Sequence, residues 1–209
     1  PERVPAPPTR SLRERLQRLD VLALTAGLWF LAKFLRYVLP PLFPTFRDVY
    51  GVSNTQLGLA FTGLLAGYAA MQFPSGALAD RVGTVRVIAG GAVVAALGAG
   101  LLFVAPGFGV LAVAVALIGV GTGAHKTVAI TLLSTVYADR TGGALGVVDT
   151  AGEFAGVVGP ALVVVVLAAA LDWRLLFLAG ALGALCLGVL FGHRVAGRAP
   201  ATTVGSGDE

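Results

Sequence analysis

Residues 57–78 read LGLAFTGLLAGYAAMQFPSGAL and contain no charged side chain. A helix needs about 20 mostly apolar residues to cross the hydrocarbon core of a bilayer, so this stretch alone predicts a membrane-spanning helix. Five further apolar stretches lie on either side of it, at about 21–42, 86–104, 110–133, 144–171 and 175–192. The sequence therefore predicts an all-α integral membrane protein built as a bundle of six transmembrane helices.

The overall composition agrees with this fold class and excludes several functions. Hydrophobic residues make up 56% of the chain and charged residues 12%, against about 25% charged in an ordinary soluble domain. A single cysteine, Cys186, excludes an internal disulfide and a thiolate metal cluster. No zinc-protease, nucleophile or phosphate-loop motif is present, so we expect no catalytic residues, no metal, no cofactor and no enzyme.

Three regions are expected along the chain. Residues 1–20 form a cytoplasmic tail with an amphipathic segment, in which leucines 12, 16 and 19 share one helical face and Ser11 with Glu14 forms a capping box. This segment is interpreted as a helix on the membrane surface, and a disordered basic tail is the alternative. Residues 21–193 form the six-helix unit, and residues 194–209 a disordered cytoplasmic tail.

The basic residues predict the orientation of the helices. Six spans place both termini on one side, which would hold ten arginines, whereas the other side holds only Arg47 and Arg174. An excess of Lys and Arg marks the cytoplasmic side, so we expect both termini in the cytoplasm of a cell membrane. The same arginines would face anionic lipids, which explains the basic balance without any nucleic-acid partner. The ten are Arg3, Arg10, Arg13, Arg15, Arg18, Arg81, Arg86, Arg140, Arg194 and Arg198.

The turn after the second predicted span carries a specific motif, GALADRVGTVRVI at residues 76–88. It resembles the signature loop of the major facilitator superfamily, G-x-L-A-D-R-x-G-R-K-x-x-I, although Thr84 and Val85 occupy its two basic positions and Arg86 follows one place later. Its two glycines, Gly76 and Gly83, are expected to let the chain reverse tightly between two helices. The resemblance implies a conformational-switch loop made of Gly76, Leu78, Asp80, Arg81, Gly83 and Arg86.

In that family the loop Asp is a latch onto the other half of the transporter. The alternative is that Asp80 and Arg81 only anchor the helix ends at the membrane interface. Two further motifs of the family are incomplete. Gly119, Gly121 and Gly123 are similar to its R-x-x-Q-G-x-G-A motif without the Arg and the Gln, and Gly159-Pro160 keeps only part of its antiporter motif.

The resemblance covers six spans, which is the N-terminal half of the twelve usual in the family, built from two inverted three-helix repeats. It implies a secondary transporter of a small solute by alternating access, and a second six-helix half as partner. Three arrangements remain open: a fragment of a twelve-span chain, which is favoured, a half-size protein that dimerises, and a split transporter. A non-transporting membrane scaffold is the alternative function.

Ionisable residues inside the spans are the candidate substrate or ion pathway. Each costs about 2.5–3.5 kcal/mol at the bilayer centre, so they must face protein or water and find partners. Counted at 1.5 Å per residue, Lys126 and Asp149 lie at about the same depth, and Lys33 is nearest in depth to Glu153. The candidates are Lys33, Arg36, Tyr37, His125, Lys126, Asp149 and Glu153.

The sequence leaves two roles open for several of these residues. The Lys126–Asp149 pair is interpreted either as a structural ion pair or as part of the pathway. Lys33 and Arg36 share one face of the first span and are expected to bind a substrate that carries a negative charge. His125 is either a proton relay or a hydrogen-bonded interior residue.

Overall fold

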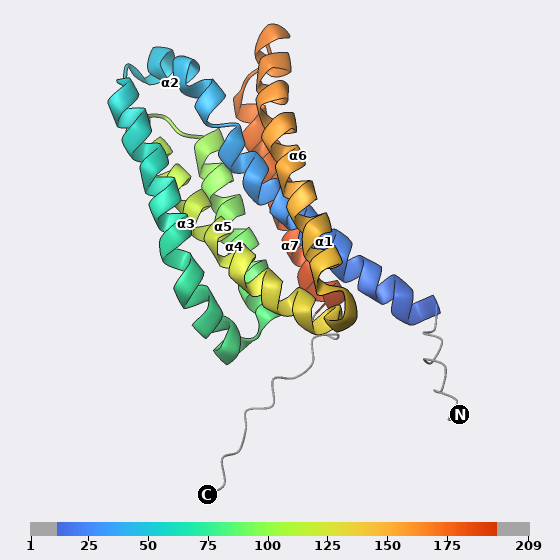
Figure 1. Ribbon diagram of the computed structural model, residues 1–209. Helices are drawn as coiled ribbons and strands as arrows, with labels where there is room; N and C mark the ends of the chain where they lie inside the picture. The colour runs from blue at the N-terminus through green and yellow to red at the C-terminus, as the bar shows by residue number, and fades with distance from the viewer. Residues whose placement is uncertain (1–11, 196–209) are drawn as a thin grey trace, which may run out of the picture.

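The computed structural model describes residues 12–195, with side chains from residue 16 onward. Six of its helices are long and apolar enough to cross a membrane, as the sequence predicts, and they lie side by side in one bundle (Figure 1). The long helices are α1 (Leu12–Tyr37), α3 (Asn54–Val82), α4 (Thr84–Phe103), α5 (Phe108–Val136), α6 (Thr141–Ala168) and α7 (Arg174–Val195). Short helices η1 (Pro40–Leu42), α2 (Phe43–Tyr50) and η2 (Ala138–Arg140) occupy two of the connections.

The start of the chain differs from the expectation. Helix α1 runs without interruption from Leu12, so residues 12–20 continue the helix of the first span and do not form a separate helix. The proposed Ser11–Glu14 capping box lies outside the described side chains, as does most of the predicted C-terminal tail. Helix α1 ends at Tyr37, three residues before Pro40 and Pro41. The short helix α2 that follows these prolines was not predicted from the sequence.

The connection between α3 and α4 consists of Gly83 alone. Its φ of 94° lies in a region that side chains disfavour, so a glycine is required at this point. Gly76 has no such role, because it lies inside α3, seven residues before the turn. The expectation that both glycines of the motif reverse the chain is therefore wrong for Gly76. At the opposite end of α3, Ser53 and Gln56 form a capping box, as expected of a Ser followed three residues later by a Gln.

The packing follows a pseudo-twofold pattern. Helix α5 packs against α3 and α4, just as α1 packs against α6 and α7, while α4 and α7 pack against each other. Exchanging the set α1, α3, α4 with the set α5, α6, α7 therefore reproduces these main contacts. This is the pattern expected of two inverted three-helix repeats.

Glycines bring α5 unusually close to two of its neighbours. A Cβ added to Gly91 on α4 would lie 2.6 Å from the carbonyl oxygen of Gly121 on α5. On the other side, a Cβ on Gly119 or Gly123 would clash with the backbone of α3 at Leu64 or Tyr68. Small residues permit such close backbone contact in membrane bundles. Gly119 and Gly123 therefore act as small residues at a close helix contact, the role that their four-residue spacing favours.

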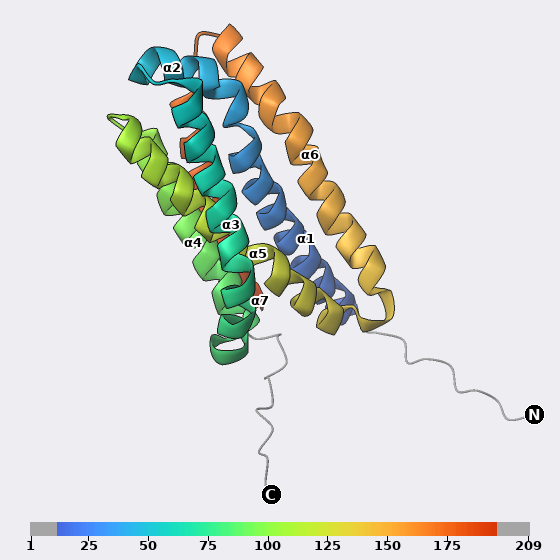
Figure 2. The ribbon, with the colours of Figure 1, turned by 60° about the vertical axis from the view of Figure 1, so that its left-hand side comes forward.

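Helices α3 and α6 are the least covered of the six. In the membrane-spanning segment, only 11% of the residues of α3 and 22% of those of α6 are buried, against 56% for α5. After a rotation of the view, these two helices flank α1 (Figure 2). The face of the bundle between them carries the candidate site.

Candidate functional site

Two ion pairs cross this face from one helix to another. Lys33 on α1 pairs with Glu153 on α6, and Lys126 on α5 pairs with Asp149 on α6. Both pairings agree with the depths counted along the sequence. The side chains are unequally covered, since Lys33 is 12% exposed and Glu153 70% exposed. Helix α6 thus supplies both carboxylates, and the helices behind it supply the cations.

Trp29 on α1 lies at the centre of the cationic side of this face. The Nζ atom of Lys126 is 5.0 Å from the centroid of the indole, and that of Lys33 is 5.6 Å away. Both distances allow a cation–π attraction. The ring also stacks on His125, with 5.7 Å between centroids and 11° between planes. Gly152 on α6 leaves room for the indole, because a Cβ at that position would clash with it.

Arg36 lies two turns further along α1 than Trp29 and has a different environment. Its guanidinium carbon is 4.1 Å from the centroid of the Tyr68 ring on α3. Its Nε and Nη2 atoms are buried and have no hydrogen-bond partner. Within residues 16–195, no ion pair joins Arg36 to a carboxylate. The site therefore holds a partly buried cation whose charge no ion pair balances among the described residues.

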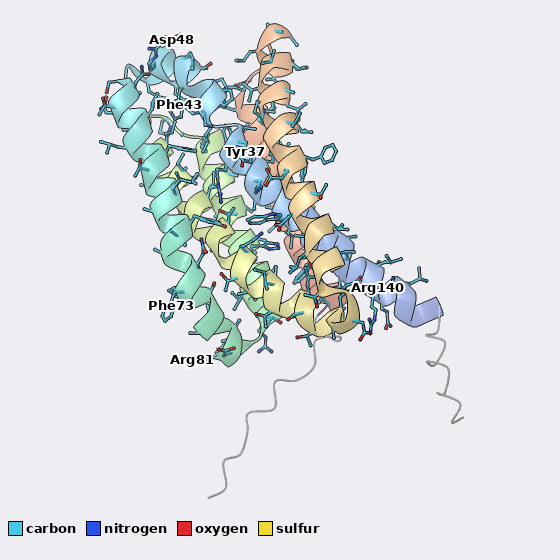
Figure 3. The ribbon with its side chains drawn as sticks, viewed as in Figure 1. Tyr37, Phe43, Asp48, Phe73, Arg81 and Arg140 are labelled. Carbon is cyan, nitrogen blue, oxygen red and sulfur yellow. The ribbon has the colours of Figure 1, made fainter. Side chains whose placement is uncertain are left out.

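Tyr37 and His125 lie on either side of this cluster. Tyr37 is at the end of α1, beside α6, where a Cβ on Gly156 would lie 3.4 Å from its ring (Figure 3). The Nζ atom of Lys33 is 6.0 Å from the Tyr37 centroid. His125 is 5% exposed and lies deeper in the bundle, in contact with Trp29. The structure thus brings all seven predicted pathway residues onto adjoining parts of α1, α5 and α6.

The motif loop lies at one end of the bundle, away from these charges. Arg81 is at that end together with Arg140, whereas Asp48 lies at the opposite end (Figure 3). Asp80 and Arg81 are exposed in the last turn of α3. Arg86 donates a hydrogen bond from Nη1 to the carbonyl oxygen of Val82, 3.2 Å away, and so caps the end of α3. A cation is favourable there because the C-terminal end of a helix is negative.

Sequence reasoning missed two aromatic residues of the site. Trp29 precedes Lys33 by four positions, so the two share a helical face, and this spacing was the available signal. Tyr68 gives no comparable local signal, because its partner Arg36 lies on a different helix. Its position depends on the close approach of α3 to α5 at Gly123.

Comparisons with known proteins fit this arrangement. A family model described as the Major Facilitator Superfamily matches residues 25–207. The chain is 30% identical, over 183 residues, to a protein of Cupriavidus necator named probable sulfoacetate transporter SauU. The match covers 85% of this chain and 41% of that protein, so the chain spans about two fifths of the length of this relative.

Solved structures show the same fold. Crystal structures of a mutant of the peptide transporter POT, one in complex with alafosfalin and one with sulfate, each superpose with a TM-score of 0.70 and 22% identity. The superpositions cover 89% and 88% of this chain and 42% of each transporter chain. The six-helix unit therefore has the fold of one part of a larger transporter.

Proposed function

The chain belongs to the major facilitator superfamily, and from this we propose that it forms half of a secondary transporter that moves a small anion across a membrane by alternating access. The chain is a multi-pass membrane protein of a transporter family. The single observation that carries the anionic substrate is the unbalanced guanidinium of Arg36, with two buried nitrogens that lack partners. The name of the Cupriavidus relative, a probable sulfoacetate transporter, supports the same substrate class.

Arg36 suits this role by its chemistry. A buried donor without a partner is costly, and a buried charge without a counter-charge is costlier still. A carboxylate or sulfonate group on the substrate would accept hydrogen bonds from the planar guanidinium and cancel its charge. Lys33 and Lys126 are already paired with carboxylates, so Arg36 is the cation we assign to the anionic group.

The exposure of Glu153 supports a second six-helix half. A carboxylate that is 70% exposed and lies about 15 Å inside the span would face lipid if nothing covered it. Lipid contact costs about 2.5–3.5 kcal/mol for such a charge, so we assign this face to a watery cavity shared with another six-helix unit. The sparse cover of α3 and α6 supports a contact of that unit with these two helices.

Asp80 is proposed as the latch between the two halves. It is exposed at the end of α3, which is one of the two helices with the least cover. Asp80→Asn should be produced and inserted normally but should transport poorly in the presence of the second half. Normal transport by this variant would make Asp80 only an interface anchor. The end of the bundle with Arg81 and Arg140 is assigned to the cytoplasm of a cell membrane, in line with the excess of arginine there.

The anionic substrate is tested with Arg36→Gln, Arg36→Lys and the control Arg47→Gln. Arg47 is exposed on α2, at the end of the bundle opposite to Arg81, so the control removes the same charge elsewhere. Binding of sulfoacetate and of an uncharged solute of similar size is measured by calorimetry on the purified protein. We expect Arg36→Gln to weaken sulfoacetate binding at least about tenfold, since each hydrogen bond to a charged group contributes about 1.5–3 kcal/mol. Arg36→Lys should recover part of the loss and Arg47→Gln should bind normally. Equal binding by wild type and Arg36→Gln would overturn the assignment.

A further inference from the structure

An open groove of about 380 Å³ runs between α4 and α7 on the outside of the bundle. Glycine, alanine and valine form its walls, and His193 supplies the one polar side chain among its lining residues. Helices α4 and α7 have their main contacts with each other and with α5 and α1. The groove therefore lies apart from the face between α3 and α6 that carries the candidate site.

Small residues produce this groove. A Cβ added to Gly188 on α7 would lie 2.9 Å from the Cβ of Ala92 on α4, so the two helices nearly touch there. At Gly90, by contrast, an added Cβ meets nothing within 4 Å. The exposed valines Val93 and Val189 also line the groove, one from each helix. The space is therefore bordered by apolar side chains and opens away from the bundle.

The surface that continues the groove along the helices is apolar and exposed. Leu97 follows Val93 by one turn on α4, and Leu185 precedes Val189 by one turn on α7. In a membrane this surface meets the hydrocarbon core, where an unfilled groove would forfeit dispersion contacts. At 1.5 Å per residue, the lining from Gly188 to His193 extends about 8 Å along α7. This length suits the part of an acyl chain that lies next to its headgroup.

Nitrogen donors stand at the mouth of the groove, near the ends of both helices. Arg86 precedes Ala89 and Gly90 on α4 by three and four positions, so it shares their helical face. His193 lines the groove from the last turn of α7. Arg86 uses Nη1 for its bond to the end of α3, and the other N–H groups of its guanidinium remain able to donate. An anionic group at the mouth would thus meet donors from two helices.

The carboxylates of this region leave the charge of Arg86 uncompensated. Asp20 on α1 pairs with Arg194, 3.4 Å away. Among the described residues, no ion pair joins Arg86 to a carboxylate. The mouth of the groove is therefore positive, while its interior is apolar. A molecule that combines an anionic group with a hydrocarbon chain is complementary to both parts.

We propose that this groove binds a phospholipid with an anionic headgroup, with one acyl chain between α4 and α7 and the phosphate at Arg86 and His193. Basic pockets between membrane helices at the cytoplasmic side bind such headgroups. The guanidinium of Arg86 donates charge-assisted hydrogen bonds to the phosphate oxygens, and the ring of His193 donates one more.

The position of the lipid gives it a structural consequence. Arg86 belongs to the set α1, α3, α4 and His193 to the set α5, α6, α7, and α4 and α7 pack against each other across these sets. One headgroup held by both residues joins the two sets. Because the lipid binds the folded bundle and not the unfolded chain, its binding stabilises the fold. The groove does not involve Arg36, so this proposal is independent of the anionic substrate.

The headgroup is tested by native mass spectrometry of the purified protein, titrated with phosphatidylglycerol or with phosphatidylcholine of the same acyl chains. We expect phosphatidylglycerol to bind at least about fivefold more tightly, the effect of one basic residue near an anionic lipid. Arg86→Gln should remove this preference, and Arg86→Lys should keep part of it. Arg47→Gln, at the opposite end of the bundle, should keep all of it.

The groove itself is tested with Gly90→Leu, which fills it. Gly100→Leu is the matched control, because it is the same change on α4, a Cβ there also meets nothing within 4 Å, and Gly100 does not line the groove. Gly90→Leu should weaken the binding of both lipids, whereas Gly100→Leu should bind them as wild type does. Phosphatidylglycerol should raise the unfolding temperature of wild type and of Gly100→Leu but not that of Gly90→Leu.

Three results would overturn the lipid site. The first is equal binding of the two lipids by wild type, and the second is a preference for phosphatidylglycerol that survives Arg86→Gln. The third is a dimer of the chain that Gly90→Leu dissociates while lipid binding stays unchanged, which would assign the groove to a second copy. If Arg86→Gln does not fold, Arg86→Lys and the two leucine variants still decide between these outcomes.

Discussion

Helix α5 meets its neighbours in two contrasting ways. Toward α3 and α4 its glycines allow the backbones to touch, with so little space that no side chain fits between them. Toward α6 the contact is sparse, and the long side chain of Lys126 reaches across to Asp149. The first kind of interface tolerates almost no change in separation, whereas the second adapts by a change of rotamers. We infer that α3, α4 and α5 move as one body and that α6 is able to shift against α5.

The largest expected effect concerns the tight side. Gly119→Ala places a methyl group against the carbonyl of Leu64, which belongs to the backbone and cannot rotate away. Overpacking costs about 1–3 kcal/mol or more, so the variant should lose much of its folded yield or melt at a clearly lower temperature. Gly63→Ala on α3 is the control, because a Cβ there meets nothing within 4 Å. Thermal unfolding followed by circular dichroism measures the stability of both variants. Equal melting temperatures would show that the contact between α3 and α5 does accommodate an added methyl group.

A smaller effect is expected from Glu153→Gln, on the α6 side. This change leaves the ammonium group of Lys33, which is only 12% exposed, without its counter-charge. An unpaired charge at a site so well covered should cost about 1–3 kcal/mol, which is measured as a lower unfolding midpoint in denaturing detergent. Lys33→Ala should cost less, because the carboxylate that it leaves behind is largely exposed. A larger loss of stability in Lys33→Ala than in Glu153→Gln would show that the ammonium group of Lys33 does not need Glu153 as its counter-charge.

The Lys126–Asp149 pair should contribute less, since its side chains are 32% and 52% exposed. Lys126→Ala and Asp149→Ala are each expected to lower stability by about 1 kcal/mol or less, as for other partly exposed pairs. The double variant should recover part of the loss, because it leaves no unpaired charge. Unfolding midpoints of the four proteins give the coupling energy. Purely additive losses would show that Lys126 and Asp149 do not interact, and that this ion pair does not hold α5 to α6.

The smallest effect concerns the far end of α5, where it is tied to α1. Tyr137 donates a hydrogen bond from its hydroxyl group to the carbonyl oxygen of Arg18, 2.6 Å away, and burial raises the pKa of Tyr137 above its usual value, against the effect of the nearby Arg18. The fold therefore favours the protonated phenol. Its contribution is complete below about pH 10 and is lost as the pH rises through the raised pKa. Tyr137→Phe should cost about 0.5 kcal/mol at pH 8, the low end of the range for one hydrogen bond because the site is only partly buried, and less at pH 11, as measured by thermal unfolding. A cost that does not change with pH would exclude the hydrogen bond as its source.

The sequence predicts the features that depend on composition and on position along one helix. Uninterrupted apolar stretches define the six spans because the bilayer fixes the length of a crossing helix. Depth counted along straight helices was sufficient to pair Lys126 with Asp149 and Lys33 with Glu153, since a charge in a span must find a partner at its own level.

Features that depend on how two helices pack against each other could not be predicted from the sequence. The stacking of Arg36 on Tyr68 requires α3 to approach α5 at Gly123, and no pattern within either helix encodes that distance. The motif glycines illustrate a second limit. Gly76 and Gly83 look equivalent in the sequence, but only Gly83 has the positive φ of a turn, because the α3 helix continues past Gly76 to Val82. The α2 helix was missed because a proline commonly ends a helix, whereas Pro44 occupies the first turn of α2, where proline is favourable.

The single-residue link at Gly83 also bears on how the protein is made. With Val82 ending α3 and Thr84 beginning α4, the two folded helices are joined as a tight hairpin whose closed end carries Arg81 and Arg86. We infer that, once both helices have entered the membrane during synthesis, this link fixes their height relative to each other. A few flexible residues inserted at Gly83 would leave that relative height to side-chain packing alone.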